Sequence, residues 1–263
     1  MRVFDRGSAR KVVALHCSLA HGGEWGGVAA QLSGVTLVAP DLPGHGAQPP
    51  WNGLSDLHGD STRLAIALAE EAGEVDLLGH SFGATVALRV ALERPELVRS
   101  LTLIEPVLFA AARAAGSPAY RDFIKDHAAF GHAVAQGNRA EAAALFLSVW
   151  GDGTAWDDLP SRQQTYVTDR IDQVAAQDPV LIGDSAGLLG YMRLESLGVP
   201  VLLLQGAQSP AIIDAIHAAL AERLPNHERQ IIAGASHMAP VTHPKDVAEA
   251  VQRHLNRNAA LCD

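Results

Sequence analysis

The chain has 263 residues, a length that fits one large α/β domain or a core domain that carries an insertion. Hydrophobic residues make up 48% of the chain and charged residues 19%, which is enough to bury a sizeable core and is unlike a disordered chain. The formal net charge of −9 argues against a nucleic-acid partner, because phosphate binding requires basic patches and the sequence contains none.

Cysteine content and the first residues bear on where the protein resides. The two cysteines, Cys17 and Cys262, lie near opposite ends of the chain, so we expect no disulfide between them and an intracellular setting. The first residues lack the apolar segment of a signal peptide, and no apolar run reaches the roughly 20 residues that cross a bilayer. The sequence thus predicts a cytoplasmic protein with no membrane partner, and it leaves the oligomeric state open.

Short apolar runs alternate with helix-forming segments along most of the chain. Strands are predicted at residues 11–16, 35–40, 75–78, 98–104, 199–206 and 229–232. Helices are predicted at residues 25–32, 57–73, 82–94, 211–224 and 244–255, the second of them starting near Asp60 and Ser61. Strands and helices that alternate at this spacing indicate a parallel sheet with right-handed crossovers.

The apolar run at residues 75–78 leads into Gly79-His80-Ser81-Phe82-Gly83, and a helix follows at once. A strand that turns directly into a helix strains the backbone of the residue at the bend, here Ser81, and the flanking glycines let neighbouring chain pass close. The N-terminus of the helix directs free N–H groups and a positive dipole end to the same place. This arrangement favours a serine that attacks a carbonyl, and it favours the oxyanion that results.

From about residue 107 to residue 197 the alternation of strands and helices stops. This stretch is helix-forming, rich in alanine and interrupted by glycine and proline, and it contains most of the aromatic residues of the chain. We expect a helical cap at residues 107–197, inserted into an α/β core made of residues 1–106 and 198–263. The aromatic side chains either form a small core of the cap or, for two or three of them, line an apolar pocket over Ser81.

Four segments of the chain, in this order, resemble the α/β-hydrolase superfamily. They are Leu15-His16 with Trp25 downstream, Asp41-Leu42-Pro43-Gly44-His45-Gly46, Gly79-His80-Ser81-Phe82-Gly83, and Gly234-Ala235-Ser236-His237. The resemblance implies an α/β-hydrolase fold, in which a mostly parallel eight-stranded sheet is flanked by helices and carries an inserted helical cap. It also implies Ser81 as nucleophile and His237 as general base, with no metal and no other cofactor.

The resemblance places the oxyanion hole at the backbone N–H groups of Phe82 and Ser18. The residue before Ser18 is usually glycine in this superfamily and is Cys17 here, so the position of the second donor is open. Cys17 itself is either a small buried filler or, as a less favoured alternative, a nucleophile.

Four residues near these segments are candidates for the lining of the substrate pocket: His16, Trp150, Trp156 and Met238. Histidines at motif positions such as His16 are more often structural. A metal site built from His16, His21 and His45 is a further alternative, which would require ligands that converge and a second shell around them.

The third member of the expected triad does not stand where many relatives carry it. They have an aspartate in a Gly-x-x-Asp-Pro segment, and here that segment is Gly206-Ala207-Gln208-Ser209-Pro210. A hydroxyl at Ser209 cannot stabilise an imidazolium as a carboxylate does. Glu105 ends an apolar strand, where a lone carboxylate is costly to bury without a partner such as the general base. We therefore expect Glu105 to be the acid, with Asp214, Asp184 or no acid as the alternatives.

These residues predict a serine hydrolase that cleaves a small or medium carboxylic ester, thioester or lactone with an apolar part. Ser81 would form an acyl-enzyme, His237 would move the proton, and Glu105 would hold His237. A dehalogenase is not expected, because that chemistry needs a carboxylate in place of Ser81. Carbon–carbon bond hydrolysis, haloperoxidase-like chemistry and acyl transfer remain alternatives on the same residues. A ligand-binding protein without turnover is a further alternative, which is suggested by Cys17 and Ser209 at positions where relatives usually have glycine and aspartate.

Overall fold

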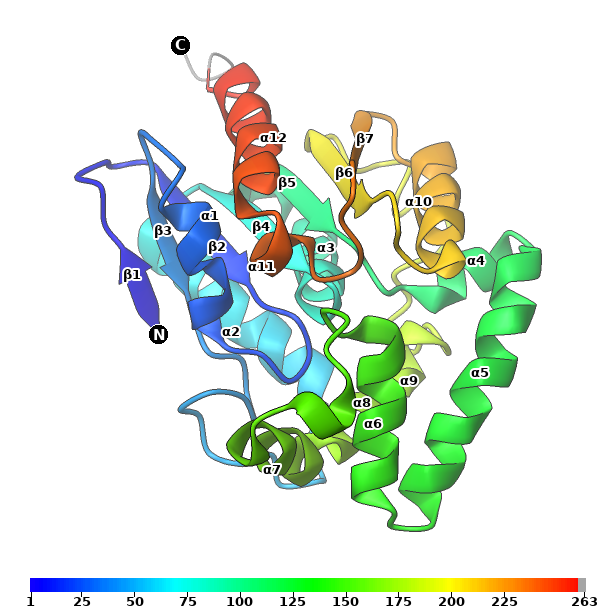
Figure 1. Ribbon diagram of the computed structural model, residues 1–263. Coiled ribbons are helices and arrows are strands. Elements are labelled where there is room, and N and C mark those ends of the chain that lie inside the picture. The colour runs from blue at the N-terminus through cyan, green and yellow to red at the C-terminus, as the bar shows by residue number, and fades with distance from the viewer. Residues whose placement is uncertain (260–263) are drawn as a thin grey trace.

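The computed structural model describes residues 1–259 of the chain. These residues form seven strands: β1 Arg2–Phe4, β2 Lys11–Leu15, β3 Thr36–Ala39, β4 Val75–His80, β5 Val98–Ile104, β6 Val201–Gly206 and β7 His227–Ile232. The strands make one sheet in the order β1-β3-β2-β4-β5-β6-β7 (Figure 1). Strand β1 runs antiparallel to β3, and all other neighbouring strands are parallel. The mostly parallel α/β sheet predicted from the sequence is confirmed.

The expectation of eight strands is wrong for the part of the chain that the structure describes. Ahead of β2 the chain forms only the three residues of β1, after which the Asp5 carboxylate accepts a 2.8 Å hydrogen bond from the Gly7 N–H. Gly7 has a φ of 70°, so the chain turns at once towards β2. The short segment between β1 and β2 leaves no length for a further strand.

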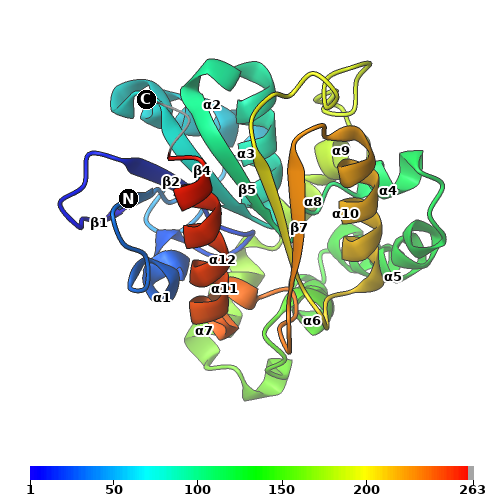
Figure 2. The same cartoon turned by 90° about the horizontal axis from the view of Figure 1, so that it is seen from above.

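Helices cover both faces of the sheet (Figure 2). One face carries α2 Leu57–Ala72, α3 Phe82–Glu93 and α10 Ala211–Arg223, and the other carries α1 Gly26–Ala29, α11 Ala239–Thr242 and α12 Pro244–Arg257. Alternate residues of a strand point to opposite faces, so Leu77 packs in the first of these cores and Leu78 in the second. Strand β4, which leads to Ser81, is therefore buried on both sides.

The helix predicted at residues 57–73 is present as α2, Leu57–Ala72, but its N-terminal cap is Asp56 and not Asp60 or Ser61. The Asp56 carboxylate accepts a 3.0 Å hydrogen bond from the Gly59 N–H. The helix expected at residues 25–32 is shorter and follows a 3₁₀ turn, η1 Gly22–Trp25. A second 3₁₀ turn, η2 Pro95–Leu97, leads into β5.

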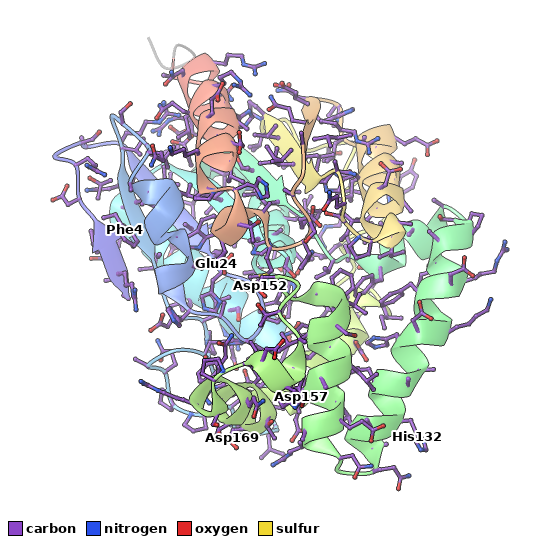
Figure 3. All side chains as sticks on the ribbon, in the orientation of Figure 1. Phe4, Glu24, His132, Asp152, Asp157 and Asp169 are labelled. Atoms are coloured by element: carbon purple, nitrogen blue, oxygen red, sulfur yellow. The ribbon has the colours of Figure 1, made fainter. Side chains whose placement is uncertain are left out.

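A helical insert lies between β5 and β6 (Figure 1). It comprises α5 Pro118–Ala135, α6 Arg139–Trp150, α7 Ser161–Arg170 and α8 Asp172–Ala175, and it is accompanied by α4 Phe109–Ala114, η3 Trp156–Asp158 and α9 Asp178–Leu181. Phe130, Val167 and Ile171 of the insert pack with Leu19, which belongs to the loop after β2. In Figure 3, Asp152 lies where the insert meets the core, whereas His132 and Asp169 lie on the part of the insert that is farther from the core. The insert thus covers the end of the sheet at which β2 and β4 finish; the boundaries 107–197 of a cap remain a prediction.

Of the two cysteines, only Cys17 lies within the described residues. Cys17 is a free, buried cysteine. Cys262 lies outside the described residues, so the prediction that the two cysteines form no disulfide is not tested. No helix within residues 1–259 is both long and apolar enough to span a membrane.

Candidate active site

Ser81 joins the end of β4 to the start of α3. Its φ of 55° and ψ of −117° place it in a backbone conformation that residues with a side chain rarely adopt. A Cβ at Gly79 would lie 2.4 Å from the Gly83 carbonyl oxygen, and a Cβ at Gly83 would lie 2.3 Å from the Leu15 carbonyl oxygen. Both glycines are therefore needed for the close approach of backbone on either side of the bend. The strained turn predicted from the motif is present, at a cost of about 1–3 kcal/mol to the fold.

Ser81, His237 and Glu105 come together although they lie on three different parts of the chain. His237 Nε2 is 3.0 Å from Ser81 Oγ, and His237 Nδ1 is 3.1 Å from Glu105 Oε2. Ser81 is 6% exposed, His237 3% and Glu105 0%, so water is largely excluded from these contacts. In this geometry Ser81 can donate its proton to Nε2 while the Nδ1–H donates to the carboxylate.

Glu105 follows the last residue of β5, in a left-handed backbone conformation with a φ of 51°. Its second oxygen, Oε1, accepts hydrogen bonds of 2.6 Å from both the Gly206 N–H and the Ser209 hydroxyl. Burial by itself would raise the pKa of Glu105, but the hydrogen bond and charge of His237, together with Ser209 and Gly206, lower it below its ordinary value. Glu105 is therefore a carboxylate at neutral pH.

The alternative acids lie elsewhere. Asp214 is paired with Arg229 at 2.8 Å, on the side of the sheet that α10 covers. Asp184 accepts the backbone N–H groups of Leu188 at 2.7 Å and of Leu189 at 3.1 Å. Within residues 1–259, neither of these aspartates is bonded to the imidazole of the candidate base.

The surroundings of the His237 imidazole set both its pKa and its orientation. Burial lowers its pKa, and although Glu105 opposes this effect, the pKa stays below the ordinary value of 6.5, with the charge of His80 adding to the lowering. The ring is therefore neutral at pH 7 and can accept a proton. Trp150, the last residue of α6, packs edge-to-face on this ring, with ring centroids 4.7 Å apart at an interplanar angle of 69°.

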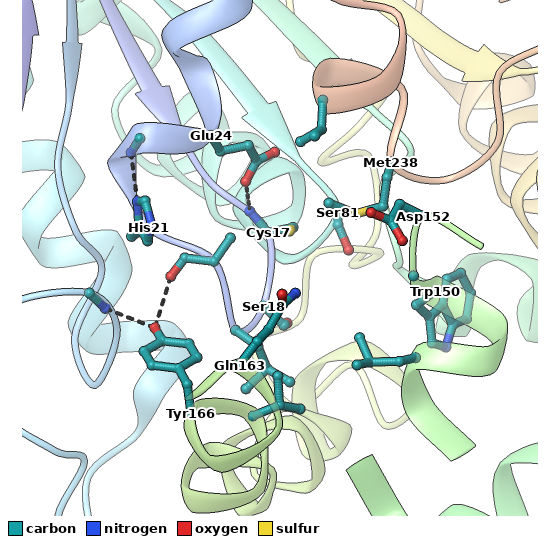
Figure 4. Close-up of a pocket in the computed structure, with 18 of the residues that line it drawn as sticks. Cys17, Ser18, His21, Glu24, Ser81, Trp150, Asp152, Gln163, Tyr166 and Met238 are labelled. Carbon is teal, nitrogen blue, oxygen red and sulfur yellow. Dashed lines mark hydrogen bonds between the residues drawn. The ribbon is translucent and has the colours of Figure 1, made fainter. Parts of the chain in front are cut away.

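The two residues expected to supply the oxyanion donors both lie next to Ser81. Ser18 lies in the loop after β2, beside Ser81 (Figure 4), and Phe82 is the first residue of α3. The backbone N–H groups of Ser18 and Phe82 donate to no other residue that the structure describes. The Ser18 hydroxyl donates a 2.8 Å hydrogen bond to Gln177 Oε1, which ties this loop to the insert.

Cys17 fits its position without a glycine. The left-handed conformation in this loop falls at Leu19, with a φ of 62°, and Cys17 is not among the residues with positive φ in residues 1–259. Its N–H donates a 3.0 Å hydrogen bond to Glu24 Oε2 (Figure 4). Burial, and to a smaller extent the nearby Glu24 carboxylate, raise the pKa of the Cys17 thiol well above its ordinary value. The thiolate is therefore disfavoured, and with it a role for Cys17 as a nucleophile.

A cavity of about 1010 Å³ opens over Ser81 (Figure 4). Ser18, Trp150, Met238 and His237 line it, together with apolar residues of α6 and α7. Its size is at the upper end of what small-molecule sites occupy, roughly 300–1,000 Å³. It has room for a substrate considerably larger than an acetate ester.

Two of the predicted pocket residues are not among the described residues that line this cavity. His16 is fully buried beneath it, where Nδ1 contacts the Cys17 carbonyl oxygen at 2.7 Å and Nε2 accepts the Leu42 N–H at 2.9 Å. Trp156 packs into the small core of the insert instead. Both positions are set by tertiary packing, which the spacing of aromatic residues and histidines does not reveal.

The alternative metal ligands do not converge as a set. His16 and His45 pack edge-to-face with ring centroids 5.1 Å apart, and His45 Nδ1 donates to the Pro43 carbonyl oxygen at 2.9 Å. His21 Nδ1 accepts the N–H of Gly23, two residues away. His45 Nε2 has no hydrogen-bonding partner among the described residues, but within residues 1–259 the three histidines do not bring their ring nitrogens together as one set of ligands.

Three further residues around the site were not identified from the sequence. Gln177 and Tyr166, both in or next to the insert, bind the core loops; the Tyr166 hydroxyl accepts the Gly46 N–H at 3.1 Å and donates to the Ala20 carbonyl oxygen at 3.3 Å. Glu24 forms a buried ion pair with His80, the residue before Ser81. The available signal for Glu24 was a single carboxylate in an otherwise uncharged loop, whereas nothing local singles out the other two.

The fold and this site define an α/β hydrolase. The sequence profile of the alpha/beta hydrolase family matches residues 12–250, and the chain belongs to this family. It is an enzyme of the esterase- and lipase-like kind.

Individual relatives agree with this family. A pimeloyl-[acyl-carrier protein] methyl ester esterase of Chromobacterium violaceum is 30% identical over 267 residues, which cover 96% of this chain and 97% of that protein. Lipase LipV of Mycobacterium tuberculosis is 36% identical over 108 residues, so that match spans only 41% of each chain. The crystal structure of the haloalkane dehalogenase DatA from Agrobacterium tumefaciens C58 superposes with a TM-score of 0.73 over 96% of this chain and 91% of that one. At 22% identity, this last similarity shows the fold alone.

Proposed function

We propose that the protein is a serine esterase that cleaves a carboxylic ester with an apolar part through an acyl-enzyme. The observation that carries the proposal is the contact of His237 Nε2 with Ser81 Oγ at 3.0 Å and of His237 Nδ1 with Glu105 Oε2 at 3.1 Å. The esterase and lipase relatives support an ester rather than a carbon–carbon or carbon–halogen bond as the point of cleavage. Thioesters and lactones of similar shape are expected to react by the same steps.

In the first half of the reaction, Ser81 Oγ attacks the carbonyl carbon while His237 Nε2 accepts the hydroxyl proton. The tetrahedral oxyanion receives hydrogen bonds from the N–H groups of Phe82 and Ser18, and the positive end of α3 points to the same oxygen. Glu105 stabilises the imidazolium that forms. His237 then gives its proton to the alkoxide that leaves, and the acyl-enzyme remains.

In the second half, His237 takes a proton from water, and the hydroxide that forms attacks the acyl carbonyl. The tetrahedral intermediate collapses, Ser81 takes back the proton from His237, and the carboxylic acid leaves. The apolar walls of the cavity that α6 and α7 supply would hold the acyl or alcohol part of the substrate. Apart from the water that is consumed, each proton in these steps moves between the substrate, Ser81 and His237.

The test is turnover of p-nitrophenyl esters of increasing acyl length, with labelling of Ser81 by a fluorescent organophosphonate. The parent should hydrolyse one or more of these esters and become labelled. Ser81→Ala should lose labelling, and its kcat should fall on the order of 10⁶-fold. A parent protein that hydrolyses no ester and leaves the phosphonate unreacted would show that the site binds a ligand without turning it over.

A further inference from the structure

A second buried histidine–carboxylate pair lies directly behind the nucleophile. His80, the residue before Ser81, is not among the described residues that line the cavity, and its side chain is 0% exposed. Its Nδ1 is hydrogen-bonded to Glu24 Oε1, and the side chain of Glu24 is 2% exposed. The proposed reaction uses neither residue.

The pair is bonded to both halves of the catalytic machinery. His80 Nε2 lies 2.8 Å from the carbonyl oxygen of His237, on the loop that carries the candidate base. Glu24 Oε2 accepts the N–H of Cys17 at 3.0 Å, and Cys17 immediately precedes the candidate oxyanion donor Ser18. An unbroken chain of hydrogen bonds therefore runs from the loop after β2, through β4, to the loop after β7.

The hydrogen-bond pattern also defines the charge of the pair. The carbonyl oxygen of His237 can only accept, so His80 Nε2 must carry a proton. A carboxylate also only accepts, so Nδ1 carries a proton as well, and the ring is an imidazolium. The pKa directions agree: burial alone would lower the pKa of His80, but Glu24 raises it, and His80 in turn lowers the pKa of Glu24 against the effect of burial.

We propose that the buried Glu24–His80 pair positions the two loops of the active site relative to each other, and so sets the distance between the Ser18 N–H and the His237 ring. This inference rests on the proposed esterase function. Both residues act through others, since neither reaches the reacting atoms. A buried ion pair contributes little net stability over a well-packed apolar pair, whereas the register it imposes on two loops is worth more to catalysis.

A conservative substitution separates the hydrogen bonds from the charge. In Glu24→Gln the amide oxygen can accept the Cys17 N–H while the amide nitrogen donates to Nδ1 of a neutral His80. The Nε2–H of that neutral ring still donates to the His237 carbonyl oxygen, so every tie is kept. Glu24→Ala removes the ties to Cys17 and His80 together.

The proposal therefore predicts a split between these two variants on the p-nitrophenyl ester panel. Glu24→Ala should lower kcat about 10²-fold with KM nearly unchanged, because a loop shifted by about 1 Å misplaces a reacting group by that much. Glu24→Gln should retain most of kcat. The matched control is His254→Gln, a buried histidine of α12 whose hydrogen-bonding partner is Asn258, and it should behave as the parent.

The pH profile gives a readout that a purely structural role would not change. The titratable and charged groups that face His80 are Glu24, His237, Glu105 and Cys17. The imidazolium of His80, with its ring centroid 5.2 Å from that of His237, lowers the pKa of His237 more than Glu24 raises it. Glu24→Gln removes the negative charge of Glu24 and leaves His80 neutral, so the pKa of His237 should rise. The acid limb of kcat/KM should therefore move to higher pH.

Two measurements decide the inference without any turnover. Amide hydrogen exchange at residues 17–19 and 237–239 should speed up together in Glu24→Ala, and not in Glu24→Gln or His254→Gln. ¹⁵N spectra of the histidine rings, assigned with His80→Gln, should show both nitrogens of His80 protonated at pH 7. If the parent turns over no ester, the proposed function fails, and these two measurements still test the pair.

The proposal is overturned by any of three results: parent-like kcat and exchange in Glu24→Ala, a loss in Glu24→Gln as large as that in Glu24→Ala, or a neutral His80 ring in the parent at pH 7. Thermal melting of each folded variant shows whether a loss reflects the site or the fold. His80→Ala should reproduce the exchange pattern of Glu24→Ala, since it cuts the same chain of hydrogen bonds at its centre.

Discussion

The hydroxyl of Ser209 donates a 2.6 Å hydrogen bond to Glu105 Oε1. Ser209 occupies the place in which many α/β hydrolases carry the acid of the triad. Here it supports a carboxylate that comes from the end of β5 instead. Under the proposed function, the acid stands at the end of β5 and not at the end of the adjacent, parallel strand β6.

This relationship predicts how the two positions respond to substitution. Glu105→Gln should lower kcat on the order of 10³-fold or more, because the imidazolium loses its counter-ion. Ser209→Ala should cost far less, since the Gly206 N–H still binds the same carboxylate oxygen. The measurement is kcat on a p-nitrophenyl ester, with labelling by a phosphonate to count active sites.

A double variant gives a sharper test of the same idea. Glu105→Ala with Ser209→Asp returns a carboxylate to the usual place, and we expect it to recover about 10-fold or more of the kcat that Glu105→Ala loses. The matched control is Glu105→Ala with Ser209→Asn, which has the same shape and no charge. Equal activity in the two double variants would contradict the assignment of an acid to this corner of the site.

The pH dependence of turnover follows from the pKa of His237, which burial lowers and Glu105 only partly restores. A general base must be neutral, so kcat/KM should be constant near pH 8 and fall as the pH drops through this pKa. Because the pKa lies below the ordinary value of 6.5, the midpoint of the fall should lie below pH 6.5. Glu105 stays ionised through this range, as its own pKa is lowered. An acid limb centred at pH 7 or above would be inconsistent with a buried, neutral base.

Stability should depend on pH through a histidine that catalysis does not use. His217 of α10 is fully buried, and within residues 1–259 neither of its ring nitrogens has a hydrogen-bonding partner. Burial lowers its pKa to about 4. The unfolded chain therefore binds more protons than the folded one between pH 6.5 and about 4, so the free energy of unfolding is fully retained above pH 6.5 and falls below it. For this group alone, the free energy of unfolding changes by at most about 1.4 kcal/mol per pH unit.

Replacing His217 with leucine should remove this dependence and the unpaired polar atoms together. We expect His217→Leu to unfold at a higher temperature than the parent, and the gap between the two to widen from pH 7 to pH 5. His132→Gln, at an exposed position of α5, is the control and should leave both melting curves unchanged. A constant difference in melting temperature across this pH range would show that His217 does not titrate in this way.

Trp150 connects the insert to the candidate base, through its edge-to-face contact with His237. Trp150→Ala should lower kcat/KM for a short ester roughly 10-fold, because an aromatic pair contributes about 0.5–1.5 kcal/mol and the ring no longer holds the imidazole. The larger cavity should at the same time shift the preference towards longer acyl chains. Trp150→Phe keeps an aromatic ring and should lose less. The ratio of kcat/KM for octanoate and acetate esters measures the shift, and an unchanged ratio in Trp150→Ala would place the acyl chain elsewhere.

Local sequence determined most of the strands and helices of the core, and the bend at which Ser81 lies. Apolar runs without alternation predicted strands buried on both faces, as Leu77 and Leu78 of β4 show. The Gly-x-Ser-x-Gly motif predicted the strained turn, since only glycine leaves room for backbone within 2.4 Å of an added Cβ. Glu105 could be proposed as a partner of His237 from the cost of ending an apolar strand with an unpaired carboxylate.

The tertiary structure decided which side chains meet, because contacts between distant loops depend on the lengths and angles of every crossover between them. The Glu24 and His80 side chains lie 56 residues apart in sequence, and His80 and His237 lie 157 apart. No periodicity joins such positions. The same reason explains why Trp150 faces the cavity while Trp156 packs into the insert. The residues proposed to carry the chemistry could be chosen from local pattern, whereas the shape of the pocket and the bonds that hold its loops follow from packing.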